Sequence, residues 1–277
     1  MQPPIPYMDH ATCHRLETIM STQNAGFARR GKEMDPAGSF ATTPVLGGHA
    51  VFASPEASPV NKVTGGGLSG PVAPDEFDRF EAFFRERGVP PKLEVGPFAD
   101  ASLLKLLRER GYTVETFMCT HVRYMGAAWE EPAPSPSVAV EPATPGTIEE
   151  FSDTIVRGFL EGAPMVAAFR DMNRGMADLP GALPLIARLD GCAAGAASMR
   201  VSTDDAGPVG VLFGASTLPE FRRRGVQTAL LAARLRHARE KGCGVAVVQS
   251  RPGTSSERNM ARFGFRLAYN KAVMSKA

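Results

Sequence analysis

The sequence has few cysteines and lacks any long apolar run. Only four cysteines occur among 277 residues, and they stand singly, without the close pairs of a zinc site or the density of a disulfide framework. We therefore expect no metal and a reducing, cytoplasmic environment. The N-terminus lacks a basic start followed by an apolar stretch, and no segment reaches about eighteen consecutive apolar residues, so we expect neither a signal peptide nor a membrane span. The cysteines are Cys13, Cys119, Cys192 and Cys243.

An excess of charge of either sign is also missing. The 31 Lys and Arg nearly balance the 29 Asp and Glu, which leaves a formal net charge of +2. No global field then draws the chain to nucleic acid or to an anionic membrane surface, and we expect neither as a partner. With 43% hydrophobic residues, the chain can bury the core of one large domain or of two ordinary ones.

A proline-rich segment divides the sequence into two halves. Five prolines fall between Gly126 and Pro145, mixed with Ala, Ser and Glu. Proline at this density resists both helix and central strand, which is typical of an extended linker. We predict one domain over 1–128, a linker over 129–137 and a second domain over 138–277.

Each half predicts a mixture of helices and strands. In the first half, four phenylalanines from Phe77 to Phe84 give an amphipathic helix that ends at Gly88. In the second half, Asp190-Gly191 is a hairpin turn between two apolar stretches. The expected helices are 9–34, 77–87, 101–110, 147–160, 165–174, 227–241 and 254–263, and the expected strands are 45–54, 60–68, 92–95, 112–124, 138–141, 183–189, 192–202, 209–217, 245–249 and 265–274.

The two halves show signs of a duplication. Arg110-Gly111-Tyr112 and Phe263-Gly264-Phe265 each turn a helix into a closing aromatic strand. The first half also contains Gly65-Gly66-Gly67 after a strand. A phosphate-binding loop would need a lysine and a helix start at a fixed offset, so a turn or bulge is expected there.

A basic segment connects a strand to a helix in the second half. It runs Leu-Pro-Glu-Phe-Arg-Arg-Arg-Gly-Val-Gln from Leu218 to Gln227. Proline ends the strand, and Gly225 lets the backbone turn so that successive N–H groups face outward. Those donors, the helix dipole and the arginines suit a pyrophosphate. Three arginines in a row are usually a solvated surface, and only their place between strand and helix favours anion binding.

Arg222 and Gly225 fit a motif of Gln or Arg, two residues, Gly, one residue, and Gly or Ala, with Gln227 in place of the usual small residue. Through this motif and the order of elements around it, the segment from about Val138 onward resembles the GNAT N-acetyltransferase superfamily. The resemblance implies an α+β fold of two GNAT-like domains, each a mostly antiparallel mixed sheet flanked by helices. The N-terminal half resembles the superfamily more distantly and has no Arg-x-x-Gly segment before its phenylalanine-rich helix, so we expect a degenerate partner.

The resemblance also implies where acetyl-CoA binds. In this superfamily the fourth and fifth strands diverge, main-chain groups of the fourth strand hold the pantetheine, and the loop that follows holds the pyrophosphate. Thr254 to Glu257 forms a capping box that opens the next helix. The expected acetyl-CoA-binding residues are Ser216, Thr217, Leu218, Arg222, Arg224, Gly225, Val226, Gln227, Thr228, Ser256 and Asn259.

Catalytic residues cannot be assigned in the same way. Many relatives use a tyrosine four residues before the Gly-Phe pair as general acid, and Met260 occupies that place. Tyr269 is a possible substitute, although an aromatic residue on a strand is more often core. The strand over 209–217 contains no carboxylate base, and Asp204 and Asp205 belong to a turn. Holding the reactants together supplies ~7–11 kcal/mol of the barrier, so the catalytic residues stay unassigned.

Three functions fit these features. The first is an acetyl-CoA-dependent N-acetyltransferase, a transferase that acetylates a small-molecule amine and works as a monomer or homodimer. The second is a non-catalytic acyl-CoA-binding sensor or scaffold that has lost turnover. The third is a tandem acyltransferase in which both halves share the architecture and one performs transfer. Release of free thiol from acetyl-CoA in the presence of amines separates the first two.

Overall fold

A computed structural model describes residues 8–34, 39–54, 58–126, 135, 137–159 and 166–276. The chain divides into two compact units. The N-terminal unit comprises Pro6–Thr120 and Leu267–Ala277, and the C-terminal unit contains His121–Arg266. The last strand, within the predicted 138–277 domain, thus belongs to the N-terminal unit because it pairs there with a strand of that unit. The predicted linker over 129–137 lies mostly outside the described residues, and its boundaries stay a prediction.

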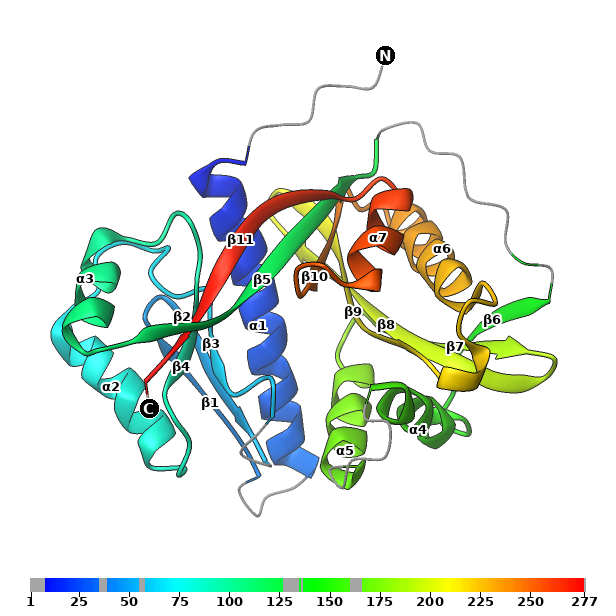
Figure 1. Ribbon diagram of the computed structural model, residues 1–277, viewed down its shortest axis with the longest axis horizontal. Coiled ribbons are helices and arrows are strands. Elements are labelled where there is room, and N and C mark those ends of the chain that lie inside the picture. Colours follow the sequence, from blue (N-terminus) through cyan, green and yellow to red (C-terminus); the bar gives the residue numbers. More distant parts are fainter. Residues whose placement is uncertain are drawn as a thin grey trace. The chain divides into compact units, whose positions relative to one another are not determined.

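The N-terminal unit is a mixed sheet with helices (Figure 1). Its strands follow the order β1-β2-β3-β4-β11-β5. The β1–β2, β2–β3 and β4–β11 pairs are antiparallel, and β3 pairs parallel to β4. The elements are α1 (His10–Met34), β1 (Phe40–Val45), β2 (Gly48–Ala53), β3 (Lys62–Thr64), α2 (Pro74–Arg85), β4 (Lys92–Val95), α3 (Ala101–Glu109), β5 (Thr113–Tyr124) and β11 (Arg266–Ser275).

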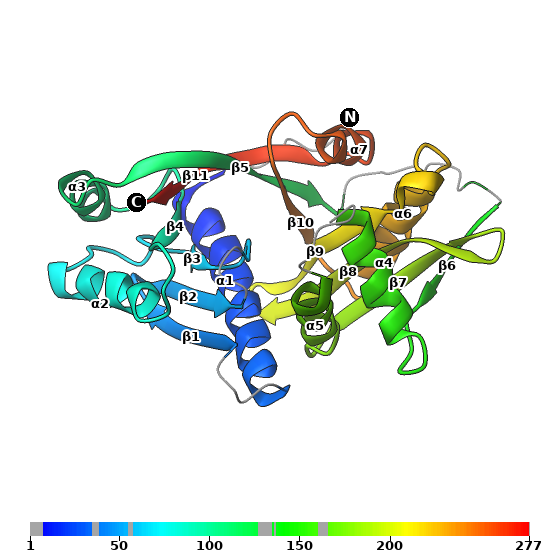
Figure 2. The ribbon, with the colours of Figure 1, turned by 60° about the horizontal axis from the view of Figure 1, so that its bottom comes forward.

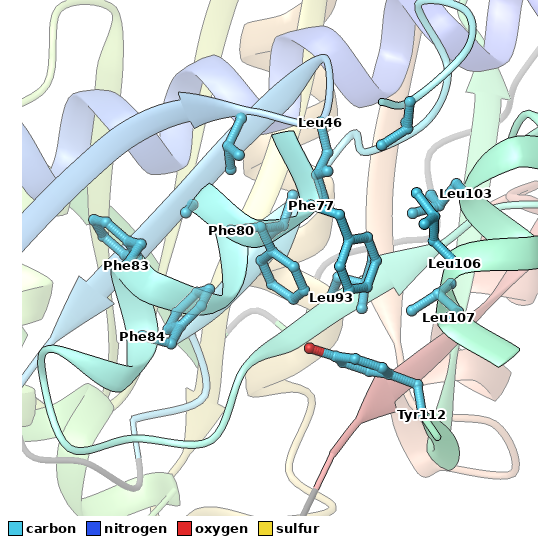
Figure 3. Packing of buried hydrophobic residues seen from close by; sticks show 14 of the residues in the cluster. Leu46, Phe77, Phe80, Phe83, Phe84, Leu93, Leu103, Leu106, Leu107 and Tyr112 are labelled. Carbon is cyan, nitrogen blue, oxygen red and sulfur yellow. The ribbon is translucent and has the colours of Figure 1, made fainter. Parts of the chain in front are cut away.

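The core of this unit forms around the aromatic face predicted for α2. Phe77 and Phe80 are fully buried and meet edge to face, with ring centroids 5.2 Å apart. Tyr112 packs edge to face on Phe77, and Leu103 and Leu107 of α3 line the same core (Figure 3). Edge-to-face aromatic pairs add about 0.5–1.5 kcal/mol beyond the area that they bury. The phenylalanine spacing therefore places α2 on its sheet through this cluster.

The C-terminal unit repeats the plan of the N-terminal unit. Its strands follow the order β10-β9-β8-β7-β6, with β6 to β9 antiparallel in succession and β10 parallel to β9. In both units a run of antiparallel strands is followed by one parallel pair whose strands a helix connects, β3–α2–β4 in one unit and β9–α6–β10 in the other. A duplication predicts this repetition. The elements are β6 (Val138–Pro142), α4 (Ile148–Phe159), α5 (Val166–Ala177), β7 (Ala182–Leu189), β8 (Cys192–Asp204), β9 (Gly207–Thr217), η1 (Pro219–Phe221), α6 (Val226–Glu240), β10 (Val245–Ser250) and α7 (Ser255–Arg262).

Helices cover both faces of the C-terminal sheet. Ile186 and Ala196 pack with Phe151 and Ile155 of α4, whereas the alternate residues of β7 and β8 pack with α6. Successive side chains of a strand point to opposite faces, so α4 and α6 lie on opposite sides of the sheet (Figure 2). Among the described residues, no helix is both long enough and apolar enough to cross a membrane.

The mixed α+β class, with a mostly antiparallel sheet, is confirmed, and two predicted strands need correction. The strand predicted over 45–54 is in fact the turn and second strand of the β1–β2 hairpin. Leu46 and Gly47 form the turn with φ of 58° and 77°, the left-handed geometry that two-residue hairpin turns require. The strand predicted over 60–68 is shortened to β3, because Gly65 and Gly67 also have positive φ and turn the chain.

Candidate functional site

The predicted basic loop lies between β9 and α6, as its sequence indicates. Pro219 begins the short helix η1, and Gly225 is the N-cap of α6 with φ of 86°. This left-handed conformation favours glycine, because a side chain there is strained. The helix has no side-chain cap. Three backbone N–H groups of its first turn, from Val226 to Thr228, have no acceptor four residues back within the helix and suit an anion.

The arginines of the loop have different surroundings. All three side chains from Arg222 to Arg224 are exposed. The Arg222 guanidinium donates to the Thr217 carbonyl at 3.4 Å. Arg224 pairs with Asp190 at 3.0 Å. The loop thus gathers cations at the helix N-terminus, where the positive dipole end already favours negative charge.

Gln227 connects the first turn of α6 to the end of β9. Its Nε2 donates to the Thr217 hydroxyl oxygen at 2.9 Å. A glycine or alanine, the usual residue in the motif, makes no such bond. The departure from the motif therefore adds a tether between strand and helix.

The strands β9 and β10 stop pairing before they end. Their parallel register runs from Val209↔Val245 to Leu212↔Val248 and goes no further. On the other edge of β9, the register with β8 shifts between Ala196 and Ser198, so that two β9 residues face one β8 residue. Gly214 is one of these two and has φ of 57°. The bulge bends the strand just where it parts from β10, and main-chain groups after Leu212 lose β10 as a partner.

The side chain of Ser216 is used structurally. It is buried, and its hydroxyl donates to the Ile155 carbonyl of α4 at 3.1 Å. The neighbouring amide of Leu218 donates to the Ala194 carbonyl at 3.0 Å. These contacts hold the end of β9 in place. Because the Ser216 hydroxyl is already bonded, only the backbone of Ser216 is left to bind a ligand.

The predicted capping box is present at the start of α7. The Thr254 hydroxyl accepts the Glu257 amide at 3.4 Å, and the Glu257 carboxylate accepts the Gly253 amide at 2.8 Å. Ser256 is exposed and Asn259 is half-buried on the same helix. Their predicted contacts with the coenzyme stay a prediction.

The two residues considered for the general acid are both buried. Met260 packs in the core between α6, α7 and the sheet. Tyr269 belongs to the N-terminal unit, where its hydroxyl donates to Glu17 at 2.8 Å. Burial, with the nearby Glu17 charge, raises the pKa of Tyr269 far above its usual range. This phenol holds its proton and already has an acceptor for it.

Sequence reasoning missed two glycines that the site requires. A side chain at Gly195 would lie 2.6 Å from Val226 and 2.7 Å from the Ser216 carbonyl oxygen. A side chain at Gly158 would lie 2.5 Å from the Ser216 hydroxyl. Only glycine permits β8 and α4 to approach the end of β9 this closely. Isolated glycines carry no sequence signal for such contacts.

Asn173 of α5 was missed as well. It is buried, and its Nδ2 donates to the Phe169 carbonyl at 2.7 Å. Its Oδ1 lies 3.9 Å from the place that a Cβ on Gly214 would occupy. An amide acceptor thus faces the bulge of β9 from the side of α4 and α5.

Comparison with known proteins agrees with this arrangement. The sequence model of the Acetyltransferase (GNAT) family matches residues 149–265, whereas comparison with curated protein sequences gave no match. A GCN5-related N-acetyltransferase from Kribbella flavida superposes with a TM-score of 0.62 at 16% identity, over 91% of this chain and 95% of its own. A tandem GNAT protein from the clavulanic acid biosynthesis pathway gives 0.64 at 12% identity, over 96% and 94%.

A third solved structure, a GCN5-related N-acetyltransferase from Sphaerobacter thermophilus, gives a TM-score of 0.57 at 15% identity, over 82% of this chain and 71% of its own. At such identities these likenesses establish the fold, and the family match covers the segment that carries the Arg loop, β9 and β10. Residues 149–265 therefore match the Acetyltransferase (GNAT) family, and the chain has a fold similar to that of a tandem GNAT protein.

Proposed function

We propose that this protein is an acetyl-CoA-dependent N-acyltransferase that acetylates a small-molecule amine. The observation that carries the proposal is the end of the β9–β10 pairing at Leu212↔Val248, on a strand that leads into a loop of three arginines and an uncapped helix N-terminus. Diverging strands offer main-chain donors and acceptors to an extended pantetheine. The helix start and the arginines suit the pyrophosphate.

The residues present fit such a co-substrate. Gly225 leaves the helix start without a side chain, and the first-turn amides from Val226 to Thr228 lack helical acceptors. When it is bound, acetyl-CoA would supply the activated acetyl group. The chain would supply binding and orientation, which count for much of the rate in a two-substrate reaction.

We assign the amine acceptor to the face of the sheet that α4 and α5 cover, opposite α6. Asn173 Oδ1 faces Gly214 from the side of α4 and α5, and a side-chain carbonyl accepts a hydrogen bond from an amine N–H. The two substrates would then meet at the bulge of β9. This assignment supports a small acceptor and leaves its identity open to an amine library.

Among its described residues, the N-terminal unit offers no equivalent loop. Its corresponding helix, α2, begins with Pro74, Asp75 and Glu76 and has no side-chain cap. Proline lacks an N–H, and two carboxylates at the positive end of the dipole repel an anion. The Gly67 amide and carbonyl both bond within the unit, to Leu46 and Asp100. This supports one acetyl-CoA site per chain.

Isothermal titration calorimetry with acetyl-CoA, followed by thiol release with an amine library, tests the proposal. We expect one site per chain and steady thiol release with at least one amine. Two equivalent sites would contradict the degenerate role of the N-terminal unit. Binding without thiol release for any amine would favour the acyl-CoA sensor, which the burial of Met260 in the core keeps open as the second candidate.

A further inference from the structure

Three polar side chains meet at the end of β10 in the C-terminal unit. The Ser250 hydroxyl oxygen lies 3.2 Å from Nε2 of His121, and a Glu257 carboxylate oxygen lies 3.7 Å from the same nitrogen. Ser250 and His121 are exposed by only 7% and 4%. Serine, histidine and carboxylate in contact are a set that moves protons, and neither the Arg loop nor the capping box accounts for the histidine.

The register of the sheet places Ser250 beside the bulge. β10 and β9 pair with a constant offset, from Val245↔Val209 to Val248↔Leu212. Continued by two residues, the same offset sets Ser250 level with Gly214. Ser250 therefore stands past the last paired residues, on the strand that faces the divergent part of β9.

The alternation of side chains along β10 determines which face of the sheet Ser250 points to. Ala246 and Val248 pack with Leu235 of α6 and with Met260 of α7. Ser250 follows them by two-residue steps, so it points to the α6 and α7 side. The Arg loop opens α6 on that side, while Asn173 lies on the other. Ser250 is thus on the side of the coenzyme, level with the bulge where the amine would meet the thioester.

The charge environment keeps His121 ready to accept a proton. Burial lowers the pKa of His121, and the Glu257 charge opposes part of that effect. On the His121 face of β5, by strand alternation, stand Cys119 and Arg123. The Arg123 guanidinium donates to the Phe263 carbonyl. In the tautomer that carries its proton on Nδ1, the neutral ring accepts the Ser250 hydroxyl at Nε2.

We propose that Ser250 and His121 form the proton relay of acyl transfer, with Glu257 stabilising the charged ring. The proposal rests on the proposed function. As the amine nitrogen bonds to the thioester carbonyl carbon, Ser250 Oγ takes a proton from that nitrogen and passes its own to His121 Nε2. As the carbon–sulfur bond breaks, His121 returns the proton to Ser250, and Ser250 gives one to the sulfur. Amine and thioester become amide and thiol, and the protein ends as it began.

This relay would supply the general acid that Met260 cannot provide. The imidazolium formed midway carries one positive charge, and the Glu257 carboxylate 3.7 Å from Nε2 offsets it. Glu257 is itself held by the Gly253 amide at 2.8 Å, so its place is fixed by the capping box. The capping box therefore also positions a charge for the relay.

Three substitutions and one control variant test the relay in the full-length protein. Ser250→Ala and His121→Gln should each lower kcat about a hundredfold, the size expected of one acid–base group, while the acetyl-CoA Kd from calorimetry stays within about threefold. Ser250→Thr keeps the hydroxyl and should restore most of the rate. His237→Gln removes a histidine of α6 that has no contact with the relay and should leave kcat unchanged.

A second readout needs no turnover. Histidine NMR of the free protein should show a lower pKa for His121 in Glu257→Gln than in the wild type, because the carboxylate raises that pKa. The glutamine oxygen still accepts the Gly253 amide, so the fold is kept. An unchanged His121 pKa would contradict the electrostatic contact.

The outcomes separate the relay from the proposed function. If the wild type acetylates an amine and Ser250→Ala keeps more than a third of its kcat, the relay is wrong and the acyltransferase function stands. If the wild type neither binds acetyl-CoA nor releases thiol, the proposed function fails and the relay with it. Mass spectrometry that finds acetylated Ser250 during turnover would replace the relay with a covalent mechanism.

Discussion

Gln227 and Thr217 join the first turn of α6 to the last residue of β9 through a 2.9 Å hydrogen bond from Nε2 to Oγ1. The bond crosses the loop that carries the three arginines. It therefore fixes the spacing between the diverging strand, which we assign to the pantetheine, and the helix start, which we assign to the pyrophosphate.

We expect Gln227→Ala to weaken acetyl-CoA binding about fivefold. The substitution introduces a residue usual in the motif but removes the tether, and one hydrogen bond is worth about 1 kcal/mol. Calorimetry measures the effect. Thr217→Ser keeps a hydroxyl and serves as the control, and a double-mutant cycle with Thr217→Val isolates the pairwise energy. Tighter binding by Gln227→Ala would mean that the glutamine obstructs the backbone instead of ordering it.

Gly225→Glu and Gly225→Gln form a matched pair for the anion site. Both place a side chain at φ of 86°, so both should lose stability by roughly 1–2 kcal/mol. Only glutamate adds negative charge where the amides of the first turn point. We expect acetyl-CoA binding to be at least tenfold weaker for glutamate than for glutamine. Equal affinities for the two variants would mean that the loop does not bind the pyrophosphate.

Much of the fold was predictable because its elements are periodic. The phenylalanines of α2, the capping box at Thr254 and the strand–Arg loop–helix order all express local rules. The β1 strand was missed because Pro44 and neighbouring threonines break its apolar pattern. Local rules predicted the closing strand β11 but not the unit to which it belongs, since its pairing with β4 joins residues far apart in the chain.

The candidate site likewise contains residues that the sequence predicts and residues that it does not. The Arg loop and Gly225 are contiguous and carry a motif. His121 and Ser250 are 129 residues apart, and a single histidine on a strand has no recognisable pattern. Asn173 is likewise one polar residue on a helix. Such residues become a site only when the sheet register brings them together, which no single-sequence pattern records.

Tyr269→Phe separates stability from catalysis. The hydroxyl donates to the buried Glu17 carboxylate at 2.8 Å, so its loss should destabilise the N-terminal unit by about 1–3 kcal/mol. Turnover should change by less than about threefold, because this phenol holds its proton in a buried network. Urea unfolding and thiol-release kinetics measure the two effects. A hundredfold loss of kcat with unchanged stability would instead make Tyr269 the general acid.

Acid stability of the N-terminal unit should depend on Glu94. This buried carboxylate contacts Lys62 at 2.7 Å and Lys271 at 2.5 Å. Burial alone would raise the pKa of Glu94, but the two lysines outweigh it and lower the pKa from 4.5 to about 2. A carboxyl with a lowered pKa in the folded state stabilises that state above its unfolded pKa. That stabilisation is lost as the pH falls from 4.5 towards 2.

The neighbouring carboxylate Glu17 changes the profile in the opposite direction. Burial raises the pKa of Glu17, although Lys271 lies 2.9 Å from it, so protonation of Glu17 adds stability as the pH falls towards 4.5 and adds nothing further below that pH. We expect urea midpoints of the wild type to fall steeply between pH 4.5 and 2.5, a window set by the Glu94 pKa. Glu94→Gln removes the titrating group and should flatten that slope, even if it lowers stability at pH 7. Equal slopes for both proteins would place the acid-sensitive group elsewhere in the chain.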